Sequence, residues 1–227
     1  FGLFSYMSVL VDHSPADIWV MTKDVDEVNS SGSLPVRYVD RIAGLSEVDW
    51  VEPLIFGGGQ FRSGRGKAQP VQVVGLPRPG LENGPWRFDR GDLDVLLDYD
   101  GATVDGLDLK ILGFPSLLNI YEISGRRVRI NGITRNIRGF GANLVFTNFE
   151  KAREISGLAP GRCSHIILKV RPGAGAASVA TKIRALLPSA SVRTSPELSA
   201  STRRYYLLET GIGSSFGFSV IISALVG

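Results

Sequence analysis

A serine between two glycines is the first feature of this sequence that suggests chemistry. The stretch Gly213–Gly217 reads GSSFG and fits G-x-S-x-G, the turn that presents the nucleophile of serine hydrolases, here Ser215. That motif needs a strand before the serine and usually an acid and a histidine after it. No charged residue follows Ser215, and the two histidines, His13 and His165, lie upstream. The pattern therefore does not predict a hydrolase.

The same five residues also fit G-x-x-x-G, a spacing that lets two membrane helices approach closely. Small residues are common in membrane spans without any packing role, so both interpretations stay open.

A glycine-rich stretch at Phe56–Lys67, FGGGQFRSGRGK, has some features of a phosphate-binding loop. The G-x-x-x-x-G-K-[ST] pattern would require glycine where Phe61 stands and serine or threonine where Ala68 stands. A strand-like segment follows instead of a helix. We therefore expect a flexible hairpin tip, with the glycines supplying positive φ angles.

Cys163 is the single cysteine, so no internal disulfide can form. It lies two residues from His165, and the two side chains would share a face if the segment were extended. A cysteine nucleophile usually takes its base from a distant segment, and no orienting carboxylate is evident. With His13, these residues lack the spacing of a zinc site. We expect isolated structural residues.

Aspartates are frequent between residues 89 and 108. The run DYDGATVDG weakly resembles a calcium loop but lacks the oxygen ligand at position 5 and the closing glutamate at position 12. A solvated acidic face is the preferred interpretation. The residues concerned are Asp89, Asp92, Asp94, Asp98, Asp100, Asp105 and Asp108.

A basic cluster follows on two strand-like segments, at Arg126, Arg127, Arg129, Arg135 and Arg138. Alternation places Arg127 and Arg129 on one strand face. The cluster is either a solvated hairpin or a docking face for a partner protein or anionic head groups. No aromatic residues are interleaved with it as in single-strand nucleic-acid platforms, and the net charge of +3 is small. Nucleic acid is not an expected partner.

The elements that carry these residues form two similar halves. Residues 16–23 predict a strand, 35–45 a short helix opened by Pro35, and 48–56 a second strand. Residues 164–170, 179–187 and 190–195 repeat the order strand, helix, strand. Two such units in one chain predict an α+β domain split by an insertion.

The insertion between the halves is predicted to be rich in β-structure. A strand at 68–76 is followed by a loop rich in proline and glycine, then by short strands with a short helix, and the basic segments read as antiparallel strands. A strand and a helix at 144–158 lead into the second half.

Both ends of the chain are apolar. Phe1–Val11 and Thr210–Gly227 carry no charged residue, although neither reaches the roughly 20 residues that a membrane-spanning helix needs. Ser195 as N-cap, Pro196 at the first helical position and Glu197 in the first turn predict a helix that continues into the apolar run. Tyr205 and Tyr206 lie near the change from polar to apolar.

The expected segments are therefore the end of a first membrane helix at 1–11 and a first half at 12–76. A β-rich insertion follows at 77–142 and a second half at 143–195. A stalk helix runs into a second membrane helix at 196–227.

Four stretches carry a resemblance to a known family: ADIWVMTKDV, GPWRFDRGDL, GFGANLVFTNFEKAREISGL and STRRYYLLETGIG. In this order they resemble the extracytoplasmic segment of MacB/FtsX/LolC-type ABC transporter permeases, and most of all the DevC-like branch. The resemblance covers nearly the whole chain. It implies a porter-like split α+β subdomain with an inserted β-rich subdomain, flanked by truncated transmembrane helices.

The resemblance also implies a function. The domain would face the periplasm or cell exterior on a bacterial plasma membrane permease, with ATP hydrolysed by a separate cytoplasmic ABC ATPase subunit. Movement at the ATPase would be transmitted mechanically for export or extraction of a substrate. Expected partners are a paired permease or second copy in a homodimer, a periplasmic adaptor protein, and membrane lipid at both termini. No catalytic residue, cofactor or metal is expected. The alternative is a membrane-anchored sensor or assembly scaffold without transport.

Overall fold

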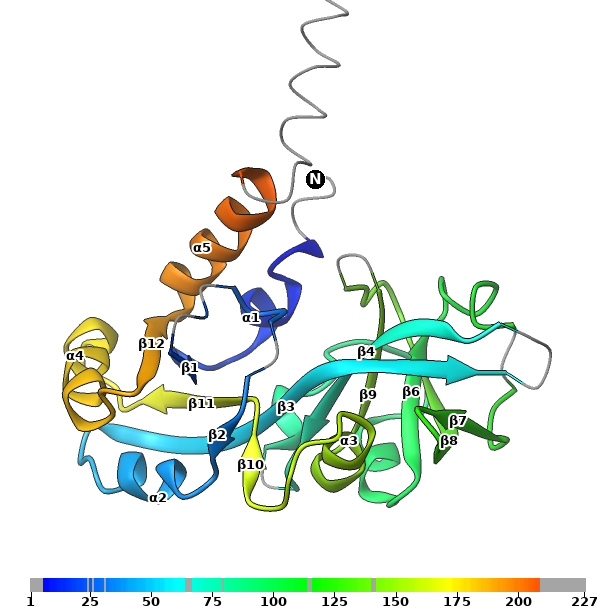
Figure 1. Ribbon diagram of the computed structural model, residues 1–227, viewed down its shortest axis with the longest axis horizontal. Helices are drawn as coiled ribbons and strands as arrows, with labels where there is room; N and C mark the ends of the chain where they lie inside the picture. The colour runs from blue at the N-terminus through cyan, green and yellow to red at the C-terminus, as the bar shows by residue number, and fades with distance from the viewer. Residues whose placement is uncertain are drawn as a thin grey trace, which may run out of the picture.

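A computed structural model describes residues 6–23, 25, 27–30, 32–63, 67–78, 80–113, 116–139 and 142–208. Its central element is β3 (Val48–Arg62), a 15-residue strand that runs through both halves of the domain (Figure 1). Up to Leu54 it pairs with β11 (His165–Val170), and from Ile55 onward it pairs with β4 (Gln69–Leu76). The strand therefore belongs to two different sheet regions in succession.

The first region has the strand order β12–β1–β11–β3, with all neighbours antiparallel. Here β1 is Ile18–Thr22 and β12 is Ala190–Thr194. Helix α2 (Tyr38–Ala43) connects β1 to β3, and α4 (Ala176–Leu186) connects β11 to β12. Two strand–helix–strand units interleaved in this way form a ferredoxin-like split unit. This confirms the split α+β architecture.

The N-terminal boundary of the predicted helix at 35–45 was wrong. α2 begins at Tyr38, after Arg37 as its N-cap. Pro35 instead closes β2 (Leu34–Pro35), which pairs with β10 (Arg162–Cys163). Proline is tolerated in such an edge strand because the ladder does not require an N–H from it.

The second region closes on itself. β4 pairs with β9 (Asn143–Asn148), β9 with β6 (Gly101–Asp105), and β6 with β8 (Arg126–Thr134). β8 pairs with β7 (Ile120–Ile123), and β7 returns to Phe61 and Arg62 of β3. These pairings form a small barrel, and closure leaves these strands few free edges. β5 (Phe88–Arg90) pairs with the end of β8.

Short helices surround the barrel: η2 (Leu81–Asn83), η3 (Leu93–Leu97) and α3 (Phe149–Ile155). The predicted antiparallel strands at the basic cluster are confirmed as the β7–β8 hairpin. Strand pairing places the change between the two sheet regions inside β3 and includes β4 and β9 in the barrel. As domain boundaries, residues 77 and 142 stay a prediction.

The core consists of two apolar clusters on opposite faces of the ferredoxin-like sheet. Ile18 and Val20 of β1 belong to the cluster with α2 and α4, which continues into the barrel interior. Trp19 and Met21 belong to the other cluster, with α1 (Val9–His13) and α5 (Ser195–Leu208). Because side chains alternate along a strand, β1 is buried on both faces. Figure 1 shows α1 and α5 on the same side of the sheet, opposite α2.

The glycines Gly57–Gly59 lie inside β3 and not in a turn, so the expected positive φ angles do not occur there. The role of Gly57 and Gly59 is close packing. An added Cβ at Gly57 would lie 2.5 Å from Ser156 Oγ, and one at Gly59 would lie 2.6 Å from Ile123 Cγ2. The hairpin tip follows Arg62, and residues 64–66 are outside the described part of the chain.

The terminal segments only partly fall within the described residues. Met7 and Val9–Val11 are buried in the domain, and Val9–Val11 belong to the apolar cluster with Trp19 and Leu198. Residues 1–5 and 209–227, where most of the predicted membrane segments fall, are outside the description. Of the helices that are described, none combines the length and the apolar character needed to cross a bilayer. The segments 1–11 and 196–227 therefore stay predictions.

Candidate functional site

Two polar pairs join α1 to α5 near the two ends of the described chain. Ser8 and Asp12 are one helical turn apart, and so are Ser199 and Arg203, so each pair projects from one helix face. Arg203 Nη2 donates to Asp12 Oδ2 at 2.6 Å and Arg203 Nε donates to Ser8 Oγ at 3.0 Å. Ser199 Oγ donates to Asp12 Oδ1 at 2.7 Å, and Ser8 Oγ to Asp12 Oδ2 at 2.8 Å. We call these four residues the terminal junction.

The loop after β1 makes further hydrogen bonds to α5 and to the residue before Ser8. The backbone N–H of Val28 donates to Thr202 Oγ1 on α5 at 3.1 Å, and both residues are buried. Asn29 Nδ2 donates to the carbonyl oxygen of Met7 at 3.1 Å. α5 is thereby held against the residues around α1 and against the loop that leaves the ferredoxin-like sheet.

The start of α5 is fixed by a reciprocal capping box. The Thr194 N–H donates to Glu197 Oε2 at 2.8 Å, and the Glu197 N–H donates to Thr194 Oγ1 at 3.4 Å. The Thr194 N–H lowers the pKa of the Glu197 carboxyl. The expected cap, Ser195, instead donates through Oγ to the Ala16 carbonyl at 2.6 Å and accepts from Trp19 Nε1 at 3.2 Å. These bonds anchor the first turn of α5 to the residues around β1.

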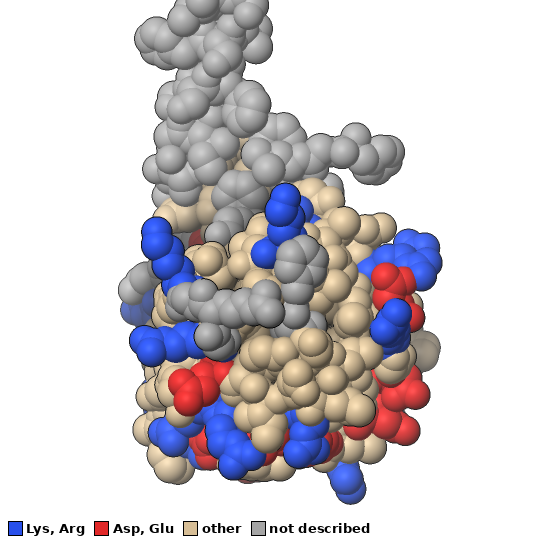
Figure 2. Space-filling model, turned by 90° about the vertical axis from the view of Figure 1, so that its right-hand side faces the viewer, with Lys and Arg blue, Asp and Glu red and all other residues tan. Residues whose placement is uncertain are grey.

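The acidic run and the basic cluster are partners in the barrel. Arg129 pairs with Asp98 at 3.1 Å, Arg138 Nε pairs with Asp108 at 2.8 Å, and Arg135 pairs with Asp89. Asp108 is fully buried, and burial raises the pKa of its carboxyl although Arg138 opposes the shift. A solvated acidic face is therefore wrong for Asp108, whereas Asp89 is exposed. In the basic cluster, Arg126 and Arg127 are exposed, as expected for a solvated hairpin. Figure 2 shows the mixture of both charge signs at this end of the molecule.

Asp92, Asp100 and Asp105 also have structural contacts. Asp100 pairs with the buried Lys151 at 2.8 Å, and the Asp92 side chain caps η3. Buried Asp105 accepts from Thr134 Oγ1 at 2.9 Å and from the Ile137 N–H at 2.8 Å. Within the described ranges, no group of three or more His, Cys, Asp or Glu side chains could hold a metal ion.

Cys163 and His165 do not form a pair. Cys163 belongs to the cluster with α2 and α4, and burial raises the pKa of its thiol to about 12. His165 contacts the rings of Trp19 and Phe56, which belong to the opposite cluster, and burial lowers the pKa of its imidazole to about 4. Its Nδ1 lies 2.8 Å from Ser164 Oγ. Ser215 and the motif around it are outside the described residues.

Four large apolar side chains of the barrel region are exposed. Leu118 is 71% exposed, Leu107 55%, Ile120 48% and Ile111 47%, and all four lie within 14 residues of sequence. Leu118 has φ of 66°, a left-handed conformation that is uncommon for a non-glycine residue. Leu107, Ile111 and Ile120 border three different hollows. We therefore restrict the name barrel-end patch to Leu118 and Ile120, which are two residues apart.

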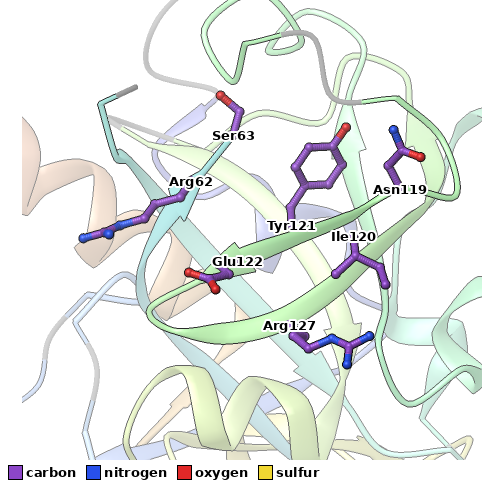
Figure 3. A pocket seen from close by; sticks show the side chains of 7 residues that line it. All are labelled: Arg62, Ser63, Asn119, Ile120, Tyr121, Glu122 and Arg127. Atoms are coloured by element: carbon purple, nitrogen blue, oxygen red, sulfur yellow. The ribbon is translucent and has the colours of Figure 1, made fainter. Parts of the chain in front are cut away.

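A shallow hollow of about 800 Å³ adjoins this patch at Ile120 (Figure 3). Arg62, Glu122 and Arg127 lie side by side across β3, β7 and β8, because Arg62 is in register with Glu122 and Glu122 with Arg127. None of the three forms an ion pair with another described residue. The hollow therefore offers two free guanidinium groups against one carboxylate, next to apolar side chains and Tyr121.

Sequence reasoning noted Arg203 but missed Asp12 and Ser199 as its partners. The four-residue spacing of Ser8 with Asp12 and of Ser199 with Arg203 was the available signal. It did not reveal that the two helices pack against each other, because they are more than 180 positions apart in the sequence.

The fold has counterparts among solved structures. The periplasmic region of MacB from Actinobacillus actinomycetemcomitans matches with a TM-score of 0.62 and 11% identity, over 83% of this chain and 92% of that one. The extracellular domain of the noncanonic ABC-type transporter YknZ from Gram-positive bacteria matches with a TM-score of 0.53 and 13% identity, over 79% and 98%. This chain has the fold of extracytoplasmic transporter domains.

A domain of a permease protein from Porphyromonas gingivalis has the same fold, with a TM-score of 0.52 and 12% identity over 82% of this chain and 90% of that one. No family model matches the sequence, and no curated protein matches it either. The predicted resemblance to MacB-type permease domains is thus confirmed at the level of the fold.

Proposed function

We propose that this chain is the extracytoplasmic domain of a bacterial ABC transporter permease that works by mechanical transmission. ATP is hydrolysed on a separate cytoplasmic subunit, and the resulting movement reaches this domain through its terminal helices, for export or extraction of a substrate. The domain itself catalyses no reaction. The terminal junction is the observation that carries this proposal, because it ties the two terminal helices to each other.

The geometry of α5 supports transmission. A continuous helix carries tilt along its length, whereas a glycine- or proline-rich linker absorbs it. α5 has a capped start, a first turn bonded to residues around β1, and a middle bonded to Val28. A displacement of its far end therefore acts on the ferredoxin-like sheet and, through Arg203 and Asp12, on α1.

The test is purification of the complete protein from its own membrane in mild detergent. We expect a nucleotide-hydrolysing subunit to co-purify and ATPase activity to accompany the complex. If the complete protein purifies without a nucleotide-hydrolysing subunit, this would contradict the proposal and favour a membrane-anchored sensor or assembly scaffold.

The role of the junction has its own test within that complex. Asp12→Ala leaves Arg203 without its carboxylate partner, so we expect ATP hydrolysis to persist while the nucleotide-dependent change in protease sensitivity of this domain is lost. Asp49→Ala, at an exposed position of β3, is the matched control and should retain the change. Retention in the Asp12 variant would contradict a transmitting role for the junction.

We further propose that the complete permease acts as a homodimer or with a second permease, and that an adaptor protein docks on the barrel-end patch. Exposed apolar side chains beside free arginines are typical of protein interfaces. Two arginines against one glutamate favour a partner segment with acidic and apolar residues. Leu118 holds an uncommon backbone conformation while exposing its side chain, which also points to an interface.

A photo-crosslinking residue at Leu118 tests the docking surface in the intact cell. We expect a covalent adduct with one extracytoplasmic protein, weakened when Arg127→Glu reverses a charge of the hollow. The same residue at Arg37, exposed at the start of α2, should give no such adduct. Adducts with lipid alone, or equal adducts at both positions, would contradict the proposal.

A further inference from the structure

α1 contacts the terminal helix on one side and the barrel on the other. Toward α5, the Asp12 carboxylate accepts hydrogen bonds from Ser199 and Arg203. Toward the barrel, the His13 imidazole stacks on the indole of Trp86, with ring centroids 4.0 Å apart and planes inclined by 7°. Ser14 Oγ, at the C-cap of α1, donates to Asn83 Oδ1 at 3.4 Å. Asp12 therefore contacts α5, while the next two residues, His13 and Ser14, contact the barrel side.

Trp86 belongs to the loop between β4 and β5, and it is fixed to the barrel wall. Its ring meets Phe146 of β9 edge-on, with centroids 6.4 Å apart and planes at 87°. It packs against the apolar cluster that also contains Val74, Leu76 and Leu144 of barrel strands β4 and β9. A force on Trp86 therefore reaches the barrel strands and is not absorbed by loose chain.

The ferredoxin-like sheet is joined to the barrel along β3 and through the apolar clusters that the two parts share. At the changeover β3 leaves β11 after Leu54 and meets β4 from Ile55, so one strand carries both sets of ladder bonds. A single twisted strand resists stretching better than it resists bending or twisting. The hydrogen bonds given above for Ser195, Ser199, Thr202 and Arg203 of α5 all end outside the barrel. A contact off the axis of β3 adds resistance to rotation of the barrel about that strand.

We propose that α1 is a brace that couples the position of α5 to the orientation of the barrel, with the stack of His13 on Trp86 as its outer contact. The brace rests on the proposed function, since it specifies how movement of the terminal helices reaches the barrel. His13 is exposed and Trp86 is half-buried, so the stack can open without unfolding the core. Its opening removes one restraint on rotation of the barrel about β3. Meanwhile Asp12 of α1 keeps its hydrogen bonds from Ser199 and Arg203.

The test measures distances by pulsed electron paramagnetic resonance in the full-length protein, reconstituted in lipid nanodiscs. Cys163 is buried, so spin labels will react with introduced cysteines. One pair, Arg204→Cys on α5 with Arg127→Cys on β8, reports the barrel. A second pair, Arg204→Cys with Asp40→Cys on α2, reports the ferredoxin-like unit. All three positions are exposed.

In the nucleotide-free protein, we expect His13→Ala to broaden the α5-to-barrel distance distribution at least twofold and leave the α5-to-α2 distribution unchanged. His13→Phe keeps an aromatic ring over Trp86 and should restore the narrow distribution, and Trp86→Leu should act like His13→Ala. An unchanged α5-to-barrel distribution in both His13→Ala and Trp86→Leu would overturn the brace. Broadening of both pairs would also overturn it, because it would mean general loosening of the domain.

Addition of a non-hydrolysable ATP analogue with the ATPase subunit separates the two proposals. A nucleotide-dependent shift of the α5-to-barrel distance that disappears in His13→Ala supports both. Absence of any shift in the unmodified protein would count against the proposed function. The width of the α5-to-barrel distance distribution without nucleotide would still test the brace.

Discussion

At the scale of single residues, charge and burial in this domain are set by partners from distant parts of the chain. Arg138 reaches the fully buried Asp108, and Lys151 is buried against Asp100. A buried charge needs such a partner because desolvation alone would be costly. His165 shows the opposite solution: it stays neutral, enclosed by the rings of Trp19 and Phe56.

The neutral state of His165 predicts an acid-sensitive fold. Its folded pKa of about 4 lies below the ordinary value of 6.5, so the unfolded chain binds the proton more tightly. Stability is therefore fully present above about pH 6.5 and falls as the pH drops toward 4, by about 3 kcal/mol from this group. Urea unfolding at pH 7 and pH 4 measures the loss. His165→Gln should show a smaller loss over this interval, and an equal loss would contradict the assignment.

At the scale of elements, close packing depends on small residues at defined places. α3 lies against β3 and β4, where Gly57 and Gly75 leave room for it. A Cβ added at Gly75 would lie 2.1 Å from the Ala152 Cβ and 3.3 Å from the Asn148 carbonyl oxygen. Gly57 lies on β3 and Gly75 on β4, and the packing of α3 against both strands explains why both positions are glycine.

Gly75→Ala should destabilise the domain by about 2 kcal/mol or more, because α3 must move away from β4 to admit the methyl group. Gly58→Ala is the matched control: it is an exposed β3 position with no atom within 4 Å of the added Cβ. It should change the free energy of unfolding by less than about 0.5 kcal/mol. Chemical denaturation of both variants checks this, and equal effects would show that the α3 contact is not limiting.

At the scale of the whole molecule, β3 joins the ferredoxin-like unit and the barrel into one core. One apolar cluster contains Ile18 and Ile183 from the first and Val73 and Val145 from the second. β3 supplies ladder bonds to both. The inserted barrel is therefore packed as a continuation of the surrounding unit.

A shared core predicts a single cooperative unfolding transition, since neither part can lose its packing alone. Tryptophan fluorescence samples the ferredoxin-like unit through Trp19 and the barrel loop through Trp86, and far-ultraviolet circular dichroism samples the backbone throughout. The curves from the two probes should coincide in urea. Two separate transitions, one for each part, would show that the shared cluster does not couple them.

The sequence alone determined the order of strands and helices in the split unit, the hairpin at the basic cluster and the helix that starts beside Pro196. These features depend on neighbouring residues: period-2 and period-3.6 patterns, caps and turns act over a few positions. It also indicated the permease-type fold, through stretches that occur in a fixed order.

Only the tertiary structure decided which charges pair, why Gly57 and Gly75 must be small, and that the strands around the insertion close into a barrel. It also decided that Asp12 meets Arg203 and that His13 meets Trp86. Such contacts join residues that are tens to nearly two hundred positions apart. Their choice among many equally suitable charges and rings is made by the path of β3 and the packing of α1 against α5, which no local pattern contains.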